Sequence, residues 1–303
     1  MASTIRCLKA ALAAGALALG LAAGASAQTA WPTSGSYSVG VSSDEAARIQ
    51  VNANAGSPIG EHFSARLGGW WVMGEDTSRA FVGDAYLDFT QDPIYLAAGR
   101  KYLVLGPAGA LVSPGVFGVE AQWRTPRMTA QALAGTLAFT PVTGGTRFTY
   151  AGSRSPADES IRAARVEVRV TDPTAEVPVT VGLNLLDVLE DTGRSADFAV
   201  QVADWLTLFG EAARYDKVDA SVYGIRASDL ARHPGGIHAT SVVLYRRNIP
   251  IGYVPAAIGA THYFEGQTGW VAGVYHQLDA RRGVGVYADQ EDAIITLFGR
   301  RPL

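Results

Sequence analysis

Hydrophobic and polar side chains alternate along much of this chain. Residues 164–171 read Ala-Arg-Val-Glu-Val-Arg-Val-Thr, so small or apolar residues occupy every second position and charged or polar residues lie between them. Because successive side chains of a strand point to opposite faces of its sheet, this segment predicts a strand with one apolar and one ionic face. In a soluble sheet the ionic face meets solvent. In a membrane barrel the apolar face meets lipid and the ionic face lines a watery lumen.

Comparable runs recur between clusters of Gly, Asp, Pro and Ser, as expected for a protein of many strands. Many have the ~9–11 residues that a tilted strand needs to cross a bilayer, whereas strands in soluble proteins more often have ~5–6. We expect strands at residues 47–55, 61–73, 79–90, 93–104, 115–124, 127–138, 145–153, 160–171, 177–187, 195–203, 205–215, 217–227, 237–247, 251–264, 267–277, 281–288 and 292–299.

The polar faces of these runs carry ionisable groups of both signs, and aromatic residues lie near the ends of several apolar faces. Phe63 begins one such face and Trp123 ends another. Lipid–water interfaces favour aromatic rings at those positions. If the runs form a membrane barrel, the side chains expected to line its lumen are Arg66, Asp84, Asp88, Glu120, Gln122, Arg124, Arg165, Glu167 and Arg169.

The first 27 residues have the pattern of a cleaved signal peptide. Arg6 and Lys9 precede an apolar run at 10–25, and Ala25-Ser26-Ala27 provides a small-x-small cleavage site. A transmembrane anchor is the alternative, but the run is rich in Ala and Gly and shorter than the ~20 apolar residues that a span needs. We therefore expect an exported protein in which residues 28–303 form a single domain.

Composition narrows the class of protein further. Cys7 lies in the expected signal, so the remaining 276 residues can form no disulfide. Without Arg6 and Lys9, 23 basic residues face 28 acidic ones, and this net charge of −5 argues against a nucleic-acid-binding protein. Charged residues make up 17% of the chain, below the ~25% usual for soluble domains. No apolar run beyond the signal is long enough for a helical span.

These observations favour a closed, antiparallel, up-and-down transmembrane β-barrel over a sandwich. The runs are long, their wet faces are charged, and no break divides the 276 residues, although a sandwich of this length would normally split into domains. At ~10 residues per strand plus turns we expect 12–16 strands, with 14 as the single best number. The alternative is a secreted or periplasmic soluble β-sandwich that binds or hydrolyses carbohydrate.

One stretch resembles a known family. It comprises Tyr95-Leu96-Ala97-Ala98-Gly99-Arg100-Lys101-Tyr102, then Gly106-Pro107-Ala108-Gly109, then Gly115-Val116-Phe117-Gly118-Val119-Glu120. It is similar to the strand–loop–strand pattern of porin-like outer-membrane barrels, in which a strand with a Gly-Arg pair leads into a Gly/Pro loop. The resemblance implies a passive diffusion channel for small polar or ionic solutes, embedded in the lipid of a bacterial outer membrane. Assembly into oligomers is compatible with such a channel. A further alternative to the channel is a non-conducting structural barrel.

Such barrels usually end on an aromatic residue, and here we expect the last strand to close at Phe298, five residues before the end.

Signatures of catalysis are not evident. His233 and His238 flank a Pro-Gly-Gly loop, with His262 and His276 further on, but no cysteine partner or His-Glu-x-x-His spacing accompanies them. The chain has no Gly-x-Ser-x-Gly elbow and no phosphate-binding loop before a helix. Paired carboxylates fall mostly in turns, where Asp commonly bonds local backbone. We therefore expect no catalytic residues, no metal site and no cofactor.

Overall fold

The computed structural model describes residues 33–42, 47–73, 78–138, 159–228, 240–277, 282–289 and 293–302. Together these residues form sixteen strands and the short helix α2 (Val254–Ala257). The strands are β1 (Thr33–Ser42), β2 (Ala47–Pro58), β3 (Phe63–Met73), β4 (Ser78–Gln91), β5 (Ile94–Tyr102), β6 (Gly115–Arg124), β7 (Met128–Ala138), β8 (Ser160–Arg169), β9 (Val179–Val188), β10 (Asp191–Ala203), β11 (Leu206–Tyr215), β12 (Val218–Ala227), β13 (Thr240–Asn248), β14 (Thr268–Gln277), β15 (Arg282–Ala288) and β16 (Ala293–Pro302). Within the described ranges, no helix combines the length and apolar character needed to cross a membrane.

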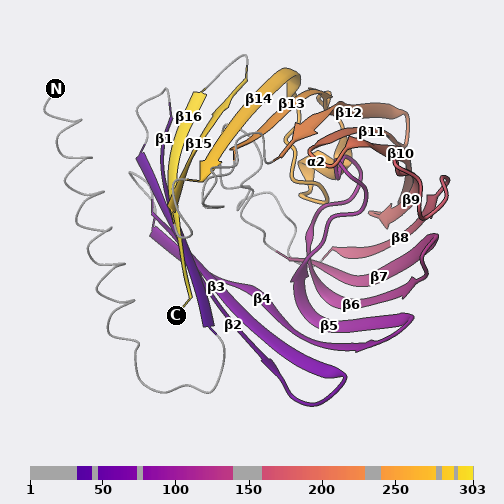
Figure 1. Cartoon of the computed structure of the whole chain (residues 1–303), viewed down its shortest axis with the longest axis horizontal. Helices are drawn as coiled ribbons and strands as arrows, with labels where there is room; N and C mark the ends of the chain where they lie inside the picture. Colours follow the sequence, from indigo (N-terminus) through magenta and orange to yellow (C-terminus); the bar gives the residue numbers. More distant parts are fainter. Residues whose placement is uncertain are drawn as a thin grey trace, which may run out of the picture.

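The strands form one closed, antiparallel, up-and-down barrel (Figure 1). Each strand pairs with its neighbours in sequence, and β1 closes the ring by pairing with both β2 and β16. This confirms the all-β, up-and-down prediction. The sixteen strands of the described chain lie at the upper limit of the expected 12–16, so the single number 14 is too low. Some connections are very short, and Leu189 and Glu190 alone join β9 to β10. More strands therefore fit into the same length.

Several strand predictions differ from the structure. The prediction missed β1, whose Gly- and Ser-rich sequence reads as a loop. Residues 251–264 form no strand; they hold α2 and belong to a connection between β13 and β14. The last strand continues past Phe298 to Pro302, because β1 supplies pairing partners as far as Ser34. The strand expected at 145–153 lies outside the described residues, as does the signal peptide expected at 1–27.

Side chains alternate between the two faces of the wall as the sequence pattern predicts. On β8, Ala163 and Arg165 are buried inside the barrel, whereas Val166 points outward and is 44% exposed. On the neighbouring strand β9, Asn184 is buried and Leu183 and Leu185 are 66% and 61% exposed on the outside. A monomeric soluble protein rarely leaves so continuous an apolar surface in water.

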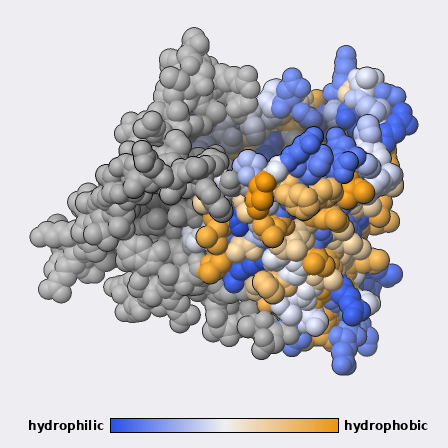
Figure 2. Space-filling model, turned by 90° about the horizontal axis from the view of Figure 1, so that it is seen from below, coloured by the Kyte–Doolittle hydropathy of each residue, from blue (hydrophilic) through white to orange (hydrophobic). Residues whose placement is uncertain are grey.

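The outward apolar side chains form a band around the described wall. In Figure 2 hydrophobic residues occupy the middle of the visible wall, and hydrophilic residues gather at its two ends. Exposed aromatic residues lie toward both ends of the strands, with Phe63, Trp123 and Trp205 at one end and Phe117 and Trp270 at the other. This distribution matches the apolar belt and aromatic girdles of membrane barrels.

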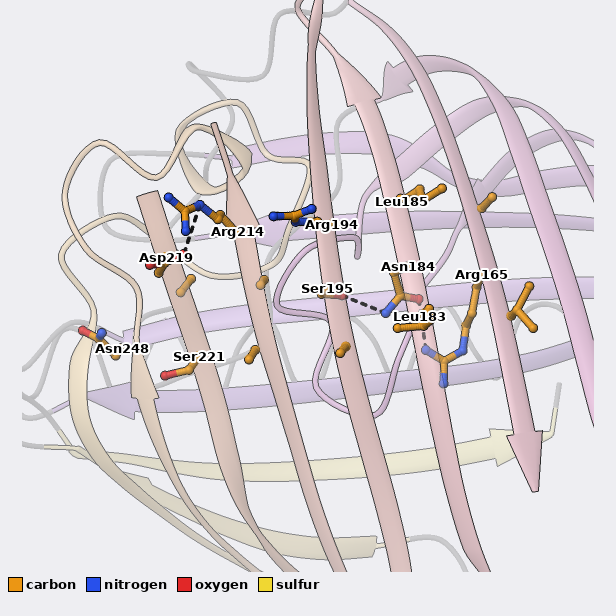
Figure 3. A pocket seen from close by; sticks show the side chains of 16 residues that line it. Arg165, Leu183, Asn184, Leu185, Arg194, Ser195, Arg214, Asp219, Ser221 and Asn248 are labelled. Carbon is orange, nitrogen blue, oxygen red and sulfur yellow. Dashed lines mark hydrogen bonds and ion pairs between the residues drawn. The ribbon is translucent and has the colours of Figure 1, made fainter. Parts of the chain in front are cut away.

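A groove of about 680 Å³ lies along the wall at β8–β13 (Figure 3). Its outward-facing floor includes the small residues Ala196 and Ala212. At one edge Arg194 is paired in register with Arg214, and Arg214 Nε lies 3.6 Å from Asp219 Oδ1. The guanidinium groups therefore lie close to the boundary of the apolar band.

Two connections fold into the barrel and create its core (Figure 1). They are residues 103–114, between β5 and β6, and residues 249–267, between β13 and β14. Leu105, Leu111 and Val112 of the first connection are fully buried. They belong to one cluster with inward-facing wall residues of β7, β8, β9, β11 and β12, which include Leu137, Ile161, Leu186, Val188, Tyr215 and Val222. Where the connections enter, this arc of the interior is apolar, so the expectation of an ionic inner face is wrong there.

Candidate functional site

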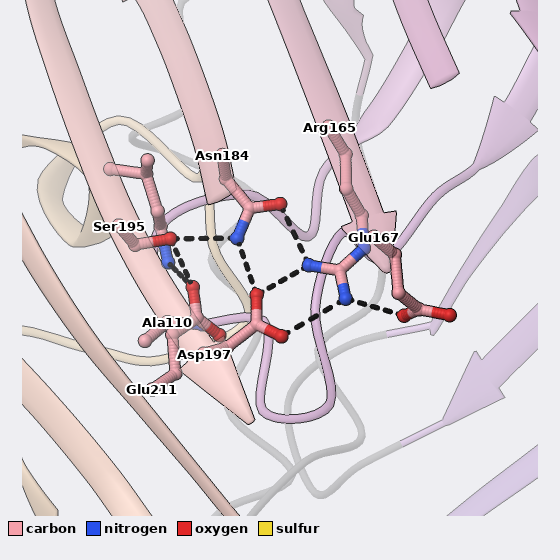
Figure 4. A network of polar contacts seen from close by, with 8 residues as sticks. Ala110, Arg165, Glu167, Asn184, Ser195, Asp197 and Glu211 are labelled. Carbon is pink, nitrogen blue, oxygen red and sulfur yellow. Dashed lines mark hydrogen bonds and ion pairs between the residues drawn. The ribbon is translucent and has the colours of Figure 1, made fainter. Parts of the chain in front are cut away.

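A buried polar network lies inside the barrel, next to Ala110 of the connection at 103–114 (Figure 4). Arg165 Nη2 donates to Asp197 Oδ1 at 3.0 Å, and Arg165 Nη1 donates to Asp197 Oδ2 and, at 3.0 Å, to Asn184 Oδ1. Asn184 Nδ2 donates to Ser195 Oγ and to Asp197 Oδ2, both at 2.8 Å. Ser195 Oγ donates to Glu211 Oε1 at 2.8 Å. Four consecutive strands, β8 to β11, thus place complementary groups at one level of the wall.

The network also holds the connection at 103–114. The buried Glu211 carboxylate accepts hydrogen bonds from the backbone N–H groups of Ala110 at 2.9 Å and Leu111 at 3.2 Å. Such charge-assisted bonds each contribute about 1.5–3 kcal/mol. Gly106 brings the same connection close to the wall: a Cβ atom there would lie 3.0 Å from Glu211 Oε2 and 3.1 Å from Asp197 Oδ2. The lack of a side chain at Gly106 is therefore what permits this approach.

The two inward connections bind each other. Ser113 N donates to Ala260 O at 2.8 Å. Three hydroxyl groups of the second connection donate to carbonyl oxygens of the first: Tyr253 to Ala110 at 3.1 Å, Thr261 to Gly109 at 2.7 Å and Tyr263 to Ala108 at 3.1 Å. Most of these groups are buried, so each would be left unsatisfied if the connections separated. The two connections therefore form one unit that narrows the interior.

His262 lies at the junction of these connections. Its Nδ1 lies 2.7 Å from Ser113 Oγ, and its backbone N–H donates to the same oxygen at 2.8 Å. Burial, together with the nearby positive charge of Arg247, lowers the pKa of His262 to about 4. Arg247 itself forms a buried ion pair with Asp289, with Nη2 and Oδ2 2.5 Å apart. His262 is therefore a neutral hydrogen-bonding group at pH 7.

Comparison with solved structures connects this geometry to known proteins. The structure of OprB from Pseudomonas putida at high pH matches with a TM-score of 0.58 and 11% identity, over 89% of this chain and 94% of that chain. A mutant of the Rh. blastica porin matches with a TM-score of 0.54 and 8% identity, over 90% and 99% of the two chains. No family model and no curated protein matches the sequence.

This chain has the porin fold. The resemblance found in residues 95–120 is therefore confirmed at the level of the fold, since identities of 8–11% support nothing finer. The closed ring of strands also differs from the two stacked layers of the sandwich alternative.

Three of the candidate lumen residues form a second cluster inside the porin-fold barrel. Glu120 accepts hydrogen bonds from Gln122, from Gln131 Nε2 at 2.6 Å and from Lys101 Nζ at 2.5 Å. Gln122 Oε1 in turn accepts from Arg124 Nε at 2.7 Å. Glu120, Gln122 and Arg124 thus lie on the interior side of β6, as their spacing of two residues predicts.

The candidates on β3 and β4 are neighbours without forming ion pairs with one another among the described residues. The Arg66 guanidinium lies 6.0 Å from the centre of the Tyr86 ring. Asp88 Oδ1 accepts from Ser64 Oγ at 2.6 Å, and Asp84 Oδ1 accepts from the Tyr102 backbone N–H at 3.0 Å. These three candidate residues therefore make separate local contacts.

On β8 the structure joins two of the three candidates. Arg165 Nη2 donates to Glu167 Oε2 at 2.6 Å. Arg169 lies on the same face, and its Nε is buried without a hydrogen-bond partner among the described residues. Arg165 and Glu167 both belong to the network of Figure 4, in which Arg165 also binds Asn184 and Asp197.

Sequence reasoning did not identify most of the residues in the network of Figure 4. Asn184, Ser195 and Glu211 each alternate with outward-facing residues, and this period of two is a signal that identifies their face. Their mutual contact is not visible in the sequence, because it depends on the register of β9, β10 and β11.

The histidines show no metal-binding arrangement within the described chain, where no group of three or more potential ligands was found. His276 Nδ1 lies 2.9 Å from Thr240 Oγ1, and His262 is committed to Ser113. His233 and His238 lie outside the described residues.

Proposed function

We propose that this protein is a porin-like channel through which small polar or ionic solutes diffuse passively across an outer membrane. The observation that carries the proposal is the opposite character of the two faces of a closed wall. Leu183 and Val166 are exposed on the outside, while Arg165, Glu120 and Asp197 lie inside. A closed ring satisfies all backbone hydrogen bonds between strands, which an open sheet edge in hydrocarbon does not.

The interior supports selection by charge and size. Ionisable groups of both signs, such as Lys101 and Glu120, create local fields that favour polar solutes over apolar ones. The unit formed by residues 103–114 and 249–267 reduces the cross-section available to a solute. In this proposal Arg66, Asp84, Asp88, Glu120, Gln122, Arg124, Arg165, Glu167 and Arg169 line the path, and no catalytic group or cofactor takes part.

Planar-bilayer recording tests the channel directly. Purified barrel added to a lipid bilayer in KCl is expected to give stepwise, stable increases in conductance. Reversal potentials in a salt gradient then report the ion selectivity. A preparation that is folded and membrane-inserted yet produces no steps contradicts the channel proposal.

A non-conducting structural barrel is the second candidate, and one observation favours it. The apolar packing of Leu105, Leu111 and Tyr253 against the wall fills part of the interior. Deleting residues 106–112 distinguishes the two functions. A channel should conduct as wild type and conduct more after the deletion, whereas a barrel sealed by this packing should be silent as wild type and conduct only after the deletion.

The proposed location is the outer membrane, reached through cleavage of residues 1–27. The apolar band and the terminal aromatics of the described wall support lipid as the surrounding medium. Fractionation should place the protein in the outer membrane, and its migration on gels should change on heating, as that of a stable barrel does. Recovery in the soluble periplasm without detergent contradicts this location.

A further inference from the structure

A cavity of about 430 Å³ lies inside the barrel between the inward connections and the wall of β11–β14. Its volume falls within the ~300–1,000 Å³ typical of small-molecule sites. Pro107 and Ala108 of one connection and Tyr263 of the other cover it. Gly273 of β14 also lies in its wall. None of the residues in the network of Figure 4 lines this cavity.

Part of the cavity lining is polar and positively charged. Arg226 lies on β12, and Ser228 lies just beyond the end of that strand. Ser241 lies on the neighbouring strand β13, in register with Tyr275. Arg226 is the only formally charged residue in the described lining, because burial keeps the pKa of His262 at about 4. No described carboxylate lines the cavity.

Most of the remaining lining is apolar and aromatic. It includes the rings of Phe209, Tyr245 and Tyr263, together with Val104 and Val243. Aromatic rings in such walls pack against flat apolar or aromatic groups. The cavity is therefore amphipathic, with a cationic group beside aromatic walls.

Arg226 lacks the carboxylate partner that three other cations inside the barrel have. Lys101 pairs with Glu120, Arg165 with Asp197 and Arg247 with Asp289. The Arg226 guanidinium instead lies 5.5 Å from the centre of the Phe209 ring and forms no ion pair with any described residue. A guanidinium group that stacks on an aromatic ring and has no carboxylate partner can bind the carboxylate of a ligand through two parallel N–H···O hydrogen bonds.

We propose that this cavity is a binding subsite for small organic anions that carry a carboxylate on an aromatic or apolar body. Arg226, with the hydroxyl groups of Ser228 and Ser241, binds the carboxylate, and the body packs between Phe209 and Tyr245. The inference rests on the proposed function, because it makes such anions a preferred class of solute for the channel.

Equilibrium binding to the detergent-solubilised barrel tests the subsite without requiring conduction. Isothermal titration with benzoate is expected to give saturable binding. Benzamide has the same ring without the charge, and acetate has the charge without the ring, so both should bind at least about tenfold more weakly. Benzamide binding as tightly as benzoate overturns the proposal, as does the absence of saturable benzoate binding.

Variants locate the site. Arg226→Gln is expected to weaken benzoate binding at least about tenfold, whereas Arg226→Lys, which keeps the charge, should retain part of it. Arg246→Gln provides the matched control, since Arg246 lies on the adjacent strand but is exposed on the outer face. Unchanged binding in folded Arg226→Gln, or an equal loss in Arg246→Gln, overturns the assignment.

Bilayer recording separates this inference from the channel itself. Benzoate should interrupt the current of the wild-type channel and of Arg246→Gln more often than that of Arg226→Gln. A barrel that conducts but binds no benzoate refutes the subsite alone. A barrel that binds benzoate and never conducts refutes the channel proposal while the binding site stands.

Discussion

At the scale of single residues, Glu211 connects the wall to the inward connections. It is buried, and its carboxylate accepts hydrogen bonds from Ala110 N–H, Leu111 N–H and Ser195 Oγ at the same time. A buried carboxylate is tolerated when hydrogen-bond donors satisfy its oxygens, as they do here. The position of residues 103–114 therefore depends on one side chain of β11.

Replacing Glu211 with Gln should loosen the connection. The amide removes the negative charge that holds two backbone N–H groups and places an N–H where an acceptor is needed. We expect a loss of about 1–3 kcal/mol in stability and faster hydrogen exchange at Ala110 and Leu111. Glu190→Gln, in an exposed turn, is the control. Equal exchange rates in the two variants contradict this role of Glu211.

His262 predicts a specific dependence on pH. The fold lowers its pKa from 6.5 to about 4, so the folded state favours the neutral form. This contribution to stability is complete above pH 6.5, falls as the pH drops from 6.5 to 4, and is lost below that range, for a total of about 3 kcal/mol. Urea unfolding of wild type and His262→Asn across this range should show the extra slope in wild type only. Parallel dependences of the unfolding free energy on pH in the two proteins would contradict the lowered pKa of His262.

At the scale of elements, the regular alternation of polar and apolar side chains allowed the strands to be predicted. The segments around β6 and β8 each place polar groups at a period of two, and their faces agree with the structure. Residues 251–264 are equally apolar but contain Gly252, Pro255 and Gly259, which interrupt a strand. Their apolar side chains pack inside the barrel, so hydrophobicity alone misassigned them.

A pair of glycines tests how closely the first connection packs. Gly106 and Gly252 have similar positive φ angles, +89° and +87°, so alanine costs about 1–2 kcal/mol of backbone strain at each. A Cβ at Gly106 meets Glu211, Asp197 and Arg165, whereas one at Gly252 has nothing within 4 Å. We expect Gly106→Ala to lower the melting temperature more and to alter conductance. Equal shifts would show that residue 106 has free space around it.

At the scale of the whole molecule, closure and the apolar exterior define the environment of the barrel. Leu183 lies near the middle of β9 and points outward. In a bilayer, Leu183→Lys should destabilise the barrel by about 2–4 kcal/mol in lipid vesicles. Glu190→Lys, at the adjoining turn, should have little effect. If Leu183→Lys leaves stability unchanged or raises it, the outer wall faces water and the membrane assignment is wrong.

The sequence by itself determined the class of fold and the facing of many strands, because the alternation of side chains along a strand is a local property. It predicted that Glu120, Arg165 and Glu167 share the polar face. Only the tertiary structure decided that β1 and β16 close the ring, that residues 103–114 fold inward onto Glu211, and that Phe209 and Arg226 border one cavity. These features depend on strand register and on contacts between residues far apart in the chain, and a local pattern carries no information about either.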